Sequence, residues 1–102
     1  MATEVKSYSI LFYGGPDGYK TNRVQIQLSD AGGKTLAWVR FSDPGMTFEN
    51  DYQSDGIIRM HLPSAMFSNV LQVLHNEKPV YVRFTQNRGV LSTSKEPVGE
   101  GE

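Results

Sequence analysis

The stretch that decides the fold covers residues 62–79 and reads LPSAMFSNVLQVLHNEKP. Its apolar residues recur at the spacing of an α-helix, with amides and hydroxyls between them. They are Met66, Phe67, Val70, Leu71, Val73 and Leu74. The pattern predicts one amphipathic helix whose apolar side needs a surface to cover it. Because the remaining segments have the patterns of strands, that surface is predicted to be a β-sheet.

Proline marks both ends of this helix. Pro63 suits a first helical turn, where its missing N–H would be unpaired anyway, and Ser64 is placed to satisfy neighbouring free amides. At the other end Lys78 puts positive charge near the free carbonyl groups, and Pro79 disfavours helical geometry in the residue before it. We expect the helix to begin near Pro63 or Ser64 and to end by Glu77 or Lys78.

Six other segments have the alternation or the apolar runs of β-strands. They are residues 5–13, 22–29, 34–42, 56–62, 80–86 and 90–94. Glycine-rich turns follow the first two, at 14–18 and 30–33, and a long polar loop occupies 43–55. The order ββββαββ predicts one α+β domain over residues 1–94, a curved antiparallel sheet with the amphipathic helix packed on one face. We expect the acidic tail 95–102 to be disordered.

The composition narrows the classes of protein to which the chain can belong. It has 102 residues, a formal net charge of -1 and no cysteine. These values allow one domain and exclude disulfide frameworks, thiolate metal sites and cysteine nucleophiles. No apolar run reaches the roughly 20 residues that cross a bilayer, and the N-terminus lacks the pattern of a signal peptide. We therefore expect a soluble cytoplasmic protein with no membrane partner.

No motif for catalysis, metal binding or cofactor binding stands out. His61 and His75 have no second ligand at the spacing of a metal site, and no serine lies in a nucleophile elbow. The glycine-rich turn at 14–18 lacks the ending of a phosphate-binding loop, and the acidic loop at 43–55 lacks the ligand spacing of a calcium loop. We expect a protein that is not an enzyme and that uses no cofactor and no metal.

The alternation within the strands assigns each side chain to one of two sheet faces. The face that meets the helix is predicted to carry Val24, Ile26, Leu28, Ala37, Val39, Phe41, Ile58, Met60, Leu62, Val80, Val82 and Phe84. The opposite face then has one arginine on each of four strands, with a tryptophan and a tyrosine among them: Arg23, Trp38, Arg40, Arg59, Tyr81 and Arg83. The segment 34–42 is apolar on both faces, so the pattern alone leaves its orientation open.

The arginines and aromatic residues of this predicted face suggest a ligand. Guanidinium groups pair with phosphates, and aromatic rings offer surfaces on which unpaired bases stack, at roughly 1–3 kcal/mol per base. We therefore expect a small non-enzymatic binding domain that forms a homodimer, with single-stranded DNA or RNA as the candidate ligand of the outward sheet face.

A subunit or partner interface is the alternative function for the same face. Leu36, Trp38 and Ile57 make it more apolar than a solvated surface, and apolar patches of this kind are usually covered by another copy or by a partner. In this interpretation the chain is a structural or protein-interaction module that forms a homodimer, and the arginines surround the interface. Salt separates the two functions, because phosphate binding weakens steeply as salt rises.

The order of elements resembles a known fold. Four strands followed by a helix, over residues 5–78, are similar to the single-stranded-DNA-binding fold of the positive-cofactor transcriptional coactivators and the plant Whirly proteins. The resemblance implies a curved sheet, dimers or larger assemblies built partly through the helix, and nucleic acid lying across sheet surfaces. It is a resemblance of topology. The lysine-rich motif of the Whirly proteins is absent, the hairpin at 80–94 is additional, and no family residue is assigned to a position here.

Overall fold

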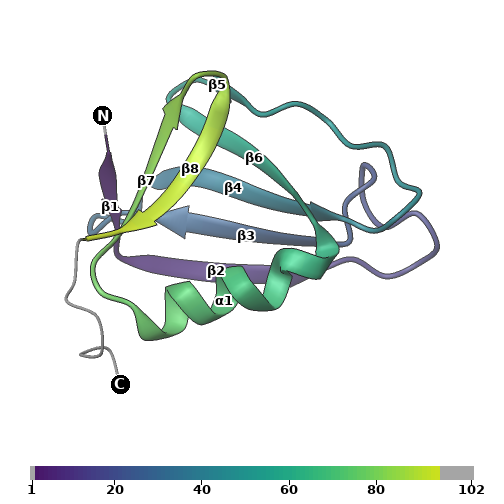
Figure 1. Ribbon diagram of the computed structural model, residues 1–102, viewed down its shortest axis with the longest axis horizontal. Coiled ribbons are helices and arrows are strands. Elements are labelled where there is room, and N and C mark those ends of the chain that lie inside the picture. The colour runs from purple at the N-terminus through teal and green to yellow at the C-terminus, as the bar shows by residue number, and fades with distance from the viewer. Residues whose placement is uncertain (1, 95–102) are drawn as a thin grey trace.

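Two β-sheets and one helix form the structure, a computed structural model in which residues 2–94 are described (Figure 1). The larger sheet has the strand order β2-β3-β4-β6-β5, with bounds Ser7–Phe12, Val24–Ser29, Thr35–Ser42, Ile57–Pro63 and Tyr52–Ser54. The smaller sheet has the order β1-β7-β8, with bounds Thr3–Val5, Val80–Thr85 and Arg88–Thr93. The chain is therefore an α+β domain.

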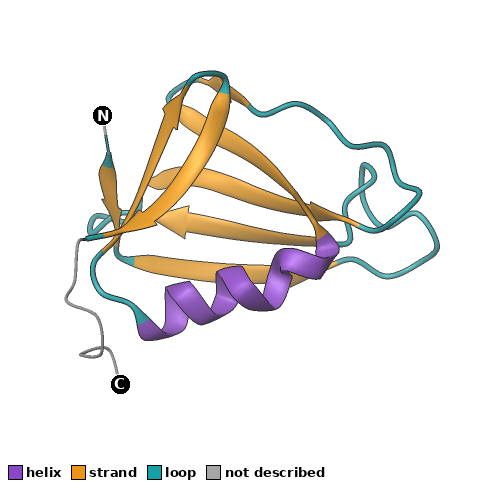
Figure 2. Ribbon diagram, in the orientation of Figure 1, coloured by secondary structure: helices purple, strands orange, loops and turns teal. Residues whose placement is uncertain are grey.

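The helix and the smaller sheet cover the same face of the larger sheet. Figure 1 shows α1 (Phe67–Asn76) and the β7–β8 hairpin in front of β2, β3, β4 and β6. The core lies between these layers and contains Ile26, Val39, Phe41, Val70 and Val82, all buried. Figure 2 shows that long loops extend from one end of the larger sheet, beyond the ends of its strands.

The inward face predicted from alternation is confirmed for β3, β4 and β6, whereas Val80, Val82 and Phe84 lie on β7 of the smaller sheet and reach the core from there. Ala37, Val39 and Phe41 have no exposed surface, so β4 turns these residues toward the core and Trp38 and Arg40 toward the outside. The helix prediction is also confirmed, since a 3₁₀ turn at Ser64–Met66 leads into α1, which ends at Asn76.

The prediction of one antiparallel sheet was wrong in two respects. First, the strand expected at 5–13 is divided: β1 pairs with β7, whereas β2 pairs with β3, so the strands fall into two sheets. Second, β4 and β6 run parallel, with Val39 beside Met60. The loop after β4 carries the chain back along the sheet before β6 begins, which gives the two strands the same direction. Alternation cannot detect either feature, because it reports faces and not partners.

A further strand, β5, lies inside the predicted loop 43–55. It pairs antiparallel with β6 through a tight turn at Asp55 and Gly56, both with positive φ (56° and 76°). Two such residues in succession form the turn whose twist suits a two-residue hairpin. The order ββββαββ therefore omitted one strand here and one at the division of 5–13.

One carboxylate connects the two sheets. Asp51, just before β5, accepts hydrogen bonds from the backbone N–H of His61 in β6 and the backbone N–H of Gly89 in β8, both at 2.8 Å. The backbone at Gly89 comes so close to β6 that a Cβ atom there would lie 3.0 Å from the Met60 side chain. Asp51 thus holds the β7–β8 hairpin against the larger sheet.

Neither helical segment within residues 2–94 is long and apolar enough to cross a membrane. The predicted disordered tail, 95–102, lies outside the described residues.

Candidate binding face

The register of the larger sheet arranges outward side chains in rows across neighbouring strands. Gln27, Trp38, Arg59 and Tyr52 form one row, from β3 through β4 and β6 to β5. Gln25, Arg40 and His61 form the next row. We refer to these seven residues as the outer face. Adjacent strands lie about 4.8 Å apart, so the backbone positions of Trp38 and Tyr52 are separated by two strand spacings, roughly 10 Å, with Arg59 between them.

Arg59 is held between backbone carbonyls and an aromatic ring. Its guanidinium carbon lies 5.6 Å from the centroid of the Tyr52 ring, and its Nη1 donates to the carbonyl oxygens of Ser54 (2.9 Å) and Ile57 (3.1 Å). Its Nε is buried and has no hydrogen-bond partner among the described residues. These contacts hold the Arg59 side chain beside Tyr52, where its positive charge interacts with the face of the aromatic ring.

Arg40 is positioned by its neighbour on β3. Its Nε donates to the Gln25 amide oxygen at 2.9 Å. Within residues 2–94 neither Arg40 nor Arg59 forms an ion pair with a carboxylate. Both guanidinium groups therefore have hydrogen-bonding capacity and positive charge left for an anionic ligand.

His61 is on the outer face but buried. Its ring stacks against Tyr52, with centroids 6.4 Å apart and planes inclined by 26°. Its Nδ1 lies 3.3 Å from the Asp51 carboxylate, and its Nε2 lies 3.8 Å from Glu49, too far for a hydrogen bond. A carboxylate only accepts hydrogen bonds, so the neutral ring carries its proton on Nδ1. His61 thus fixes the position of Tyr52.

Arg23 was predicted as a phosphate ligand, but the structure gives its guanidinium other partners. Its Nε pairs with Asp43 at 2.7 Å, and its Nη1 donates to the carbonyl oxygens of Tyr13 and Gly15, each at 2.7 Å. These contacts fasten the loop after β2 to the loop after β4. Arg23 is therefore a structural residue at the end of the sheet, not part of the outer face.

The ion pair of Arg23 changes the acidity of its partner. Hydrogen bonds from Arg23 and Ser64 hold the pKa of Asp43 below its ordinary value of 3.8. Because the folded pKa is the lower one, the ionised carboxylate stabilises the fold above about pH 4, and this contribution is lost as pH falls through the folded pKa.

We expect the substitution Arg23→Gln to raise the pKa of Asp43 toward 3.8, since the largest cause of the depression is removed. An NMR titration of the side-chain carboxyl carbons measures this pKa directly. Arg83→Gln, on β7, makes the same change of charge outside this ion pair and should leave the pKa unchanged. A pKa that stayed low in Arg23→Gln would mean that Arg23 does not stabilise the carboxylate.

Tyr81 and Arg83 were predicted on the same face as the other arginines, and this was wrong. Both lie on β7, which belongs to the smaller sheet. Figure 1 shows β7 on the side of the larger sheet that carries α1, opposite the outer face. Alternation placed these residues correctly relative to Val80 and Val82, but it could not show that β7 joins a second sheet.

Tyr52 is the outer-face residue that the sequence interpretation missed, because 43–55 was interpreted as a loop. The pair Asp55-Gly56 directly before the strand 57–63 is a hairpin signal, and it could have revealed β5. For Leu36 the sequence interpretation made the opposite error. It was expected on the outward face, but it packs against the core near Val82 and Phe84.

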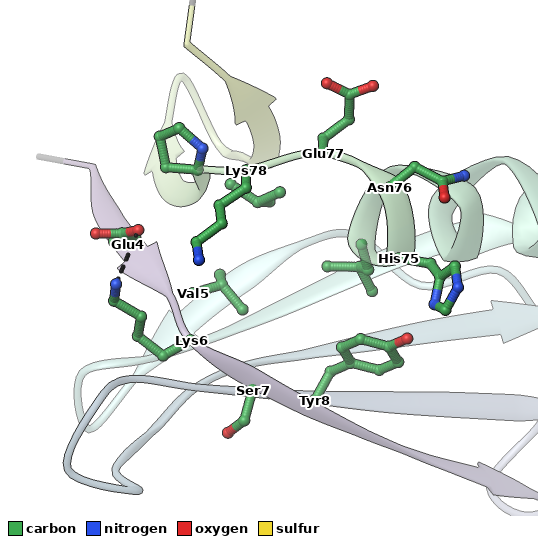
Figure 3. Close-up of a pocket in the computed structure, with 12 residues that line it drawn as sticks. Glu4, Val5, Lys6, Ser7, Tyr8, His75, Asn76, Glu77 and Lys78 are labelled. Carbon is green, nitrogen blue, oxygen red and sulfur yellow. Dashed lines mark ion pairs between the residues drawn. The ribbon is translucent and has the colours of Figure 1, made fainter. Parts of the chain in front are cut away.

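Two hollows lie elsewhere, beside α1. A cleft of about 670 Å³ lies between the C-terminal end of α1 and the point where β1 ends and β2 begins. Figure 3 shows Tyr8 of β2 and His75 of α1 on facing sides of this cleft, with the ion pair between Glu4 and Lys6 (3.2 Å) at its far end. A second groove of about 440 Å³ continues along α1 and shares Tyr8 and His75.

Among residues 2–94 the structure has no cluster of three or more histidine or carboxylate side chains that could hold a metal ion. Comparison with known proteins gives no match to a family model, to a curated protein or to a solved structure. The resemblance to the single-stranded-DNA-binding fold therefore stays a prediction, and the parallel pairing of β4 with β6 departs from the antiparallel order on which it was based.

Proposed function

We propose that the chain is a non-enzymatic binding domain whose outer face holds single-stranded nucleic acid. The observation that carries the proposal is the row in which Arg59 lies between Trp38 and Tyr52 on adjacent strands. Two aromatic residues on strands about 10 Å apart can each stack a base, and the intervening guanidinium can meet the phosphate between them. Arg40, in the next row, supplies a second positive charge free of ion pairs within residues 2–94.

The alternative, a homodimer or partner interface on the same face, has less apolar surface than the sequence suggested. Leu36 packs inward, and Trp38 and Ile57 are each partly buried. A surface with few apolar side chains and two arginines favours an anionic ligand over an apolar one.

Titration of a fluorescent single-stranded oligonucleotide at low and at moderate salt tests the proposal. We expect salt-dependent binding that is abolished or weakened at least about tenfold in the double variant Arg40→Gln, Arg59→Gln, because two phosphate contacts are lost. The magnitude of the logarithmic salt slope should fall by about 1.4, which corresponds to two phosphates on a single strand. Trp38→Ala should weaken binding at both salt concentrations, since stacking depends little on salt.

The matched control is the double variant Arg83→Gln, Arg88→Gln, which removes the same charge from exposed positions of the smaller sheet. It should bind nearly as well as the unaltered chain. Equal losses in the two double variants would mean that binding follows overall charge and not the outer face. No binding of DNA or RNA at low salt would refute the function itself.

A further inference from the structure

The strand β2 forms one edge of the larger sheet, with β3 as its partner on one side and no strand within residues 2–94 on the other. Beyond the end of β2, the N–H of Tyr13 donates to the carbonyl of Arg23 at 2.9 Å. In an antiparallel pair the residues that exchange hydrogen bonds alternate along each strand. Odd-numbered residues of β2 therefore direct their backbone groups to β3. The N–H and C=O groups of Tyr8, Ile10 and Phe12 point to the open edge.

The open edge lacks two of the usual features that prevent strand pairing. The sequence of β2 is SYSILF, without charge or proline. Two of its side chains are unusually exposed for their size, Leu11 at 48 % and Phe12 at 67 %. Such a strand is a template for another strand.

The groove beside this edge is open on the face to which Phe12 belongs. Its lining residues are Tyr8, Ser68, Leu71, Gln72, His75 and Asn76, and it has a volume of about 440 Å³. Tyr8 and Phe12 are on the same face of β2, four residues apart, and Phe12 contacts the other end of α1 through Phe67 (centroids 5.4 Å apart). Phe12 therefore lies along the same side of the strand as the groove but does not line it.

A two-fold axis through Ile10 brings together the open edges, the grooves and the Phe12 side chains of two copies. Antiparallel pairing about that axis places Ile10 opposite the partner's Ile10 and Tyr8 opposite the partner's Phe12. Residues opposite each other in an antiparallel pair share a face, so the partner's Phe12 comes to the mouth of the groove beside Tyr8. The axis repeats this contact at the other end, as an isologous interface requires.

The charges of the chain agree with this arrangement. If an edge strand carries a charge near the two-fold axis, self-association brings two like charges together, and their repulsion opposes pairing. The strand β2 has no charged residue, and the groove is lined by hydroxyl, amide, imidazole and apolar groups. The nearest cation, Lys6, would lie opposite the partner's Gly14 and not opposite its own copy. Pairing of two copies therefore places no like charges opposite each other along β2.

We propose that two copies of this chain form a dimer through antiparallel pairing of β2 with β2, with Phe12 of each copy filling the groove between β2 and α1 of the other. The two larger sheets become one continuous sheet, and the two outer faces become one surface. The proposal is independent of the outer-face ligand, because it rests on the edge, the groove and Phe12.

Two measurements test the dimer. Sedimentation equilibrium of the unaltered chain should give a dimer, and Phe12→Asp should raise the dissociation constant at least about tenfold, since it places a charge in an apolar contact. Phe48→Asp, which changes a side chain of 54 % exposure in the loop after β4, is the control and should leave the dissociation constant unchanged.

The absence of native cysteine makes cross-linking specific for the proposed register. Ser9 lies opposite the partner's Leu11 as a non-hydrogen-bonded pair, for which Cα atoms are about 4.5 Å apart, within reach of a disulfide. The double variant Ser9→Cys, Leu11→Cys should form a covalent dimer on mild oxidation, whereas either single variant should not. A monomer in sedimentation, or equal cross-linking in the single and double variants, would overturn the proposal whatever the outcome of the oligonucleotide titration.

Discussion

Replacing Phe41 with alanine is expected to lower the free energy of unfolding by about 3–5 kcal/mol. Phe41 is fully buried and is among the largest of the fully buried side chains. Its ring meets Phe67 of α1 edge to face, with centroids 5.4 Å apart and planes inclined by 87°. The substitution therefore removes both the packing inside the sheet and the contact that seats the helix, and it leaves a cavity at their junction. Equilibrium unfolding in urea measures the loss.

Phe48→Ala is the matched control for this substitution. Phe48 is 54 % exposed in the loop after β4, so its truncation should change the free energy of unfolding by no more than about 0.5 kcal/mol. If Phe41→Ala lost less than about 1.5 kcal/mol with an unchanged urea dependence, the helix would not be seated on this residue.

Replacing Asp51 with alanine is expected to lower the free energy of unfolding by about 2–4 kcal/mol. The carboxylate accepts hydrogen bonds from the backbone N–H groups of His61 and Gly89, and its side chain is only 14 % exposed. Its removal leaves these two donors in a part-buried position without partners, and each such donor costs about 1–3 kcal/mol. The His61 ring also loses its partner for Nδ1, which loosens Tyr52.

Hydrogen exchange distinguishes this loss from a general destabilisation. In Asp51→Ala the amide of Gly89 should exchange faster by a larger factor than core amides of β3, because the β7–β8 hairpin detaches first. Asp55→Asn is the control, since it alters an exposed turn residue at a positive φ that asparagine also tolerates. Uniform acceleration at Gly89 and in β3 would contradict the role of Asp51 as the connection between the sheets.

Local patterns were sufficient to predict the helix and the composition of the core. The spacing of Phe67, Val70 and Leu74 predicted the side of α1 that packs on the sheet, and the alternation in 22–29 and 56–62 predicted which side chains are buried. The structure decides the orientation of 34–42, which the sequence left open. Ala37, Val39 and Phe41 share one face of β4, between β3 and β6, and have no exposed surface.

The candidate site was predicted only in part, because its composition depends on pairing. Trp38, Arg40 and Arg59 come together since β4 and β6 are neighbours, whereas Tyr81 and Arg83 have the same alternation on a strand of another sheet. Arg23 has the correct position in the alternation, but Asp43 and loop carbonyls occupy its guanidinium. These partners are distant in sequence, and no local pattern records them.

The parallel pair of β4 and β6 divides the larger sheet into two parts that can form separately. On one side, β2, β3 and β4 are joined by consecutive antiparallel connections, and on the other β5 and β6 form a hairpin. Contacts within each part are close in sequence and can form early during folding, whereas the pairing of β4 with β6 must close a longer loop. Because α1 follows β6 through a single 3₁₀ turn and packs on Phe41 of β4, we expect its docking and the joining of the two parts to form one late step in the folding of the domain.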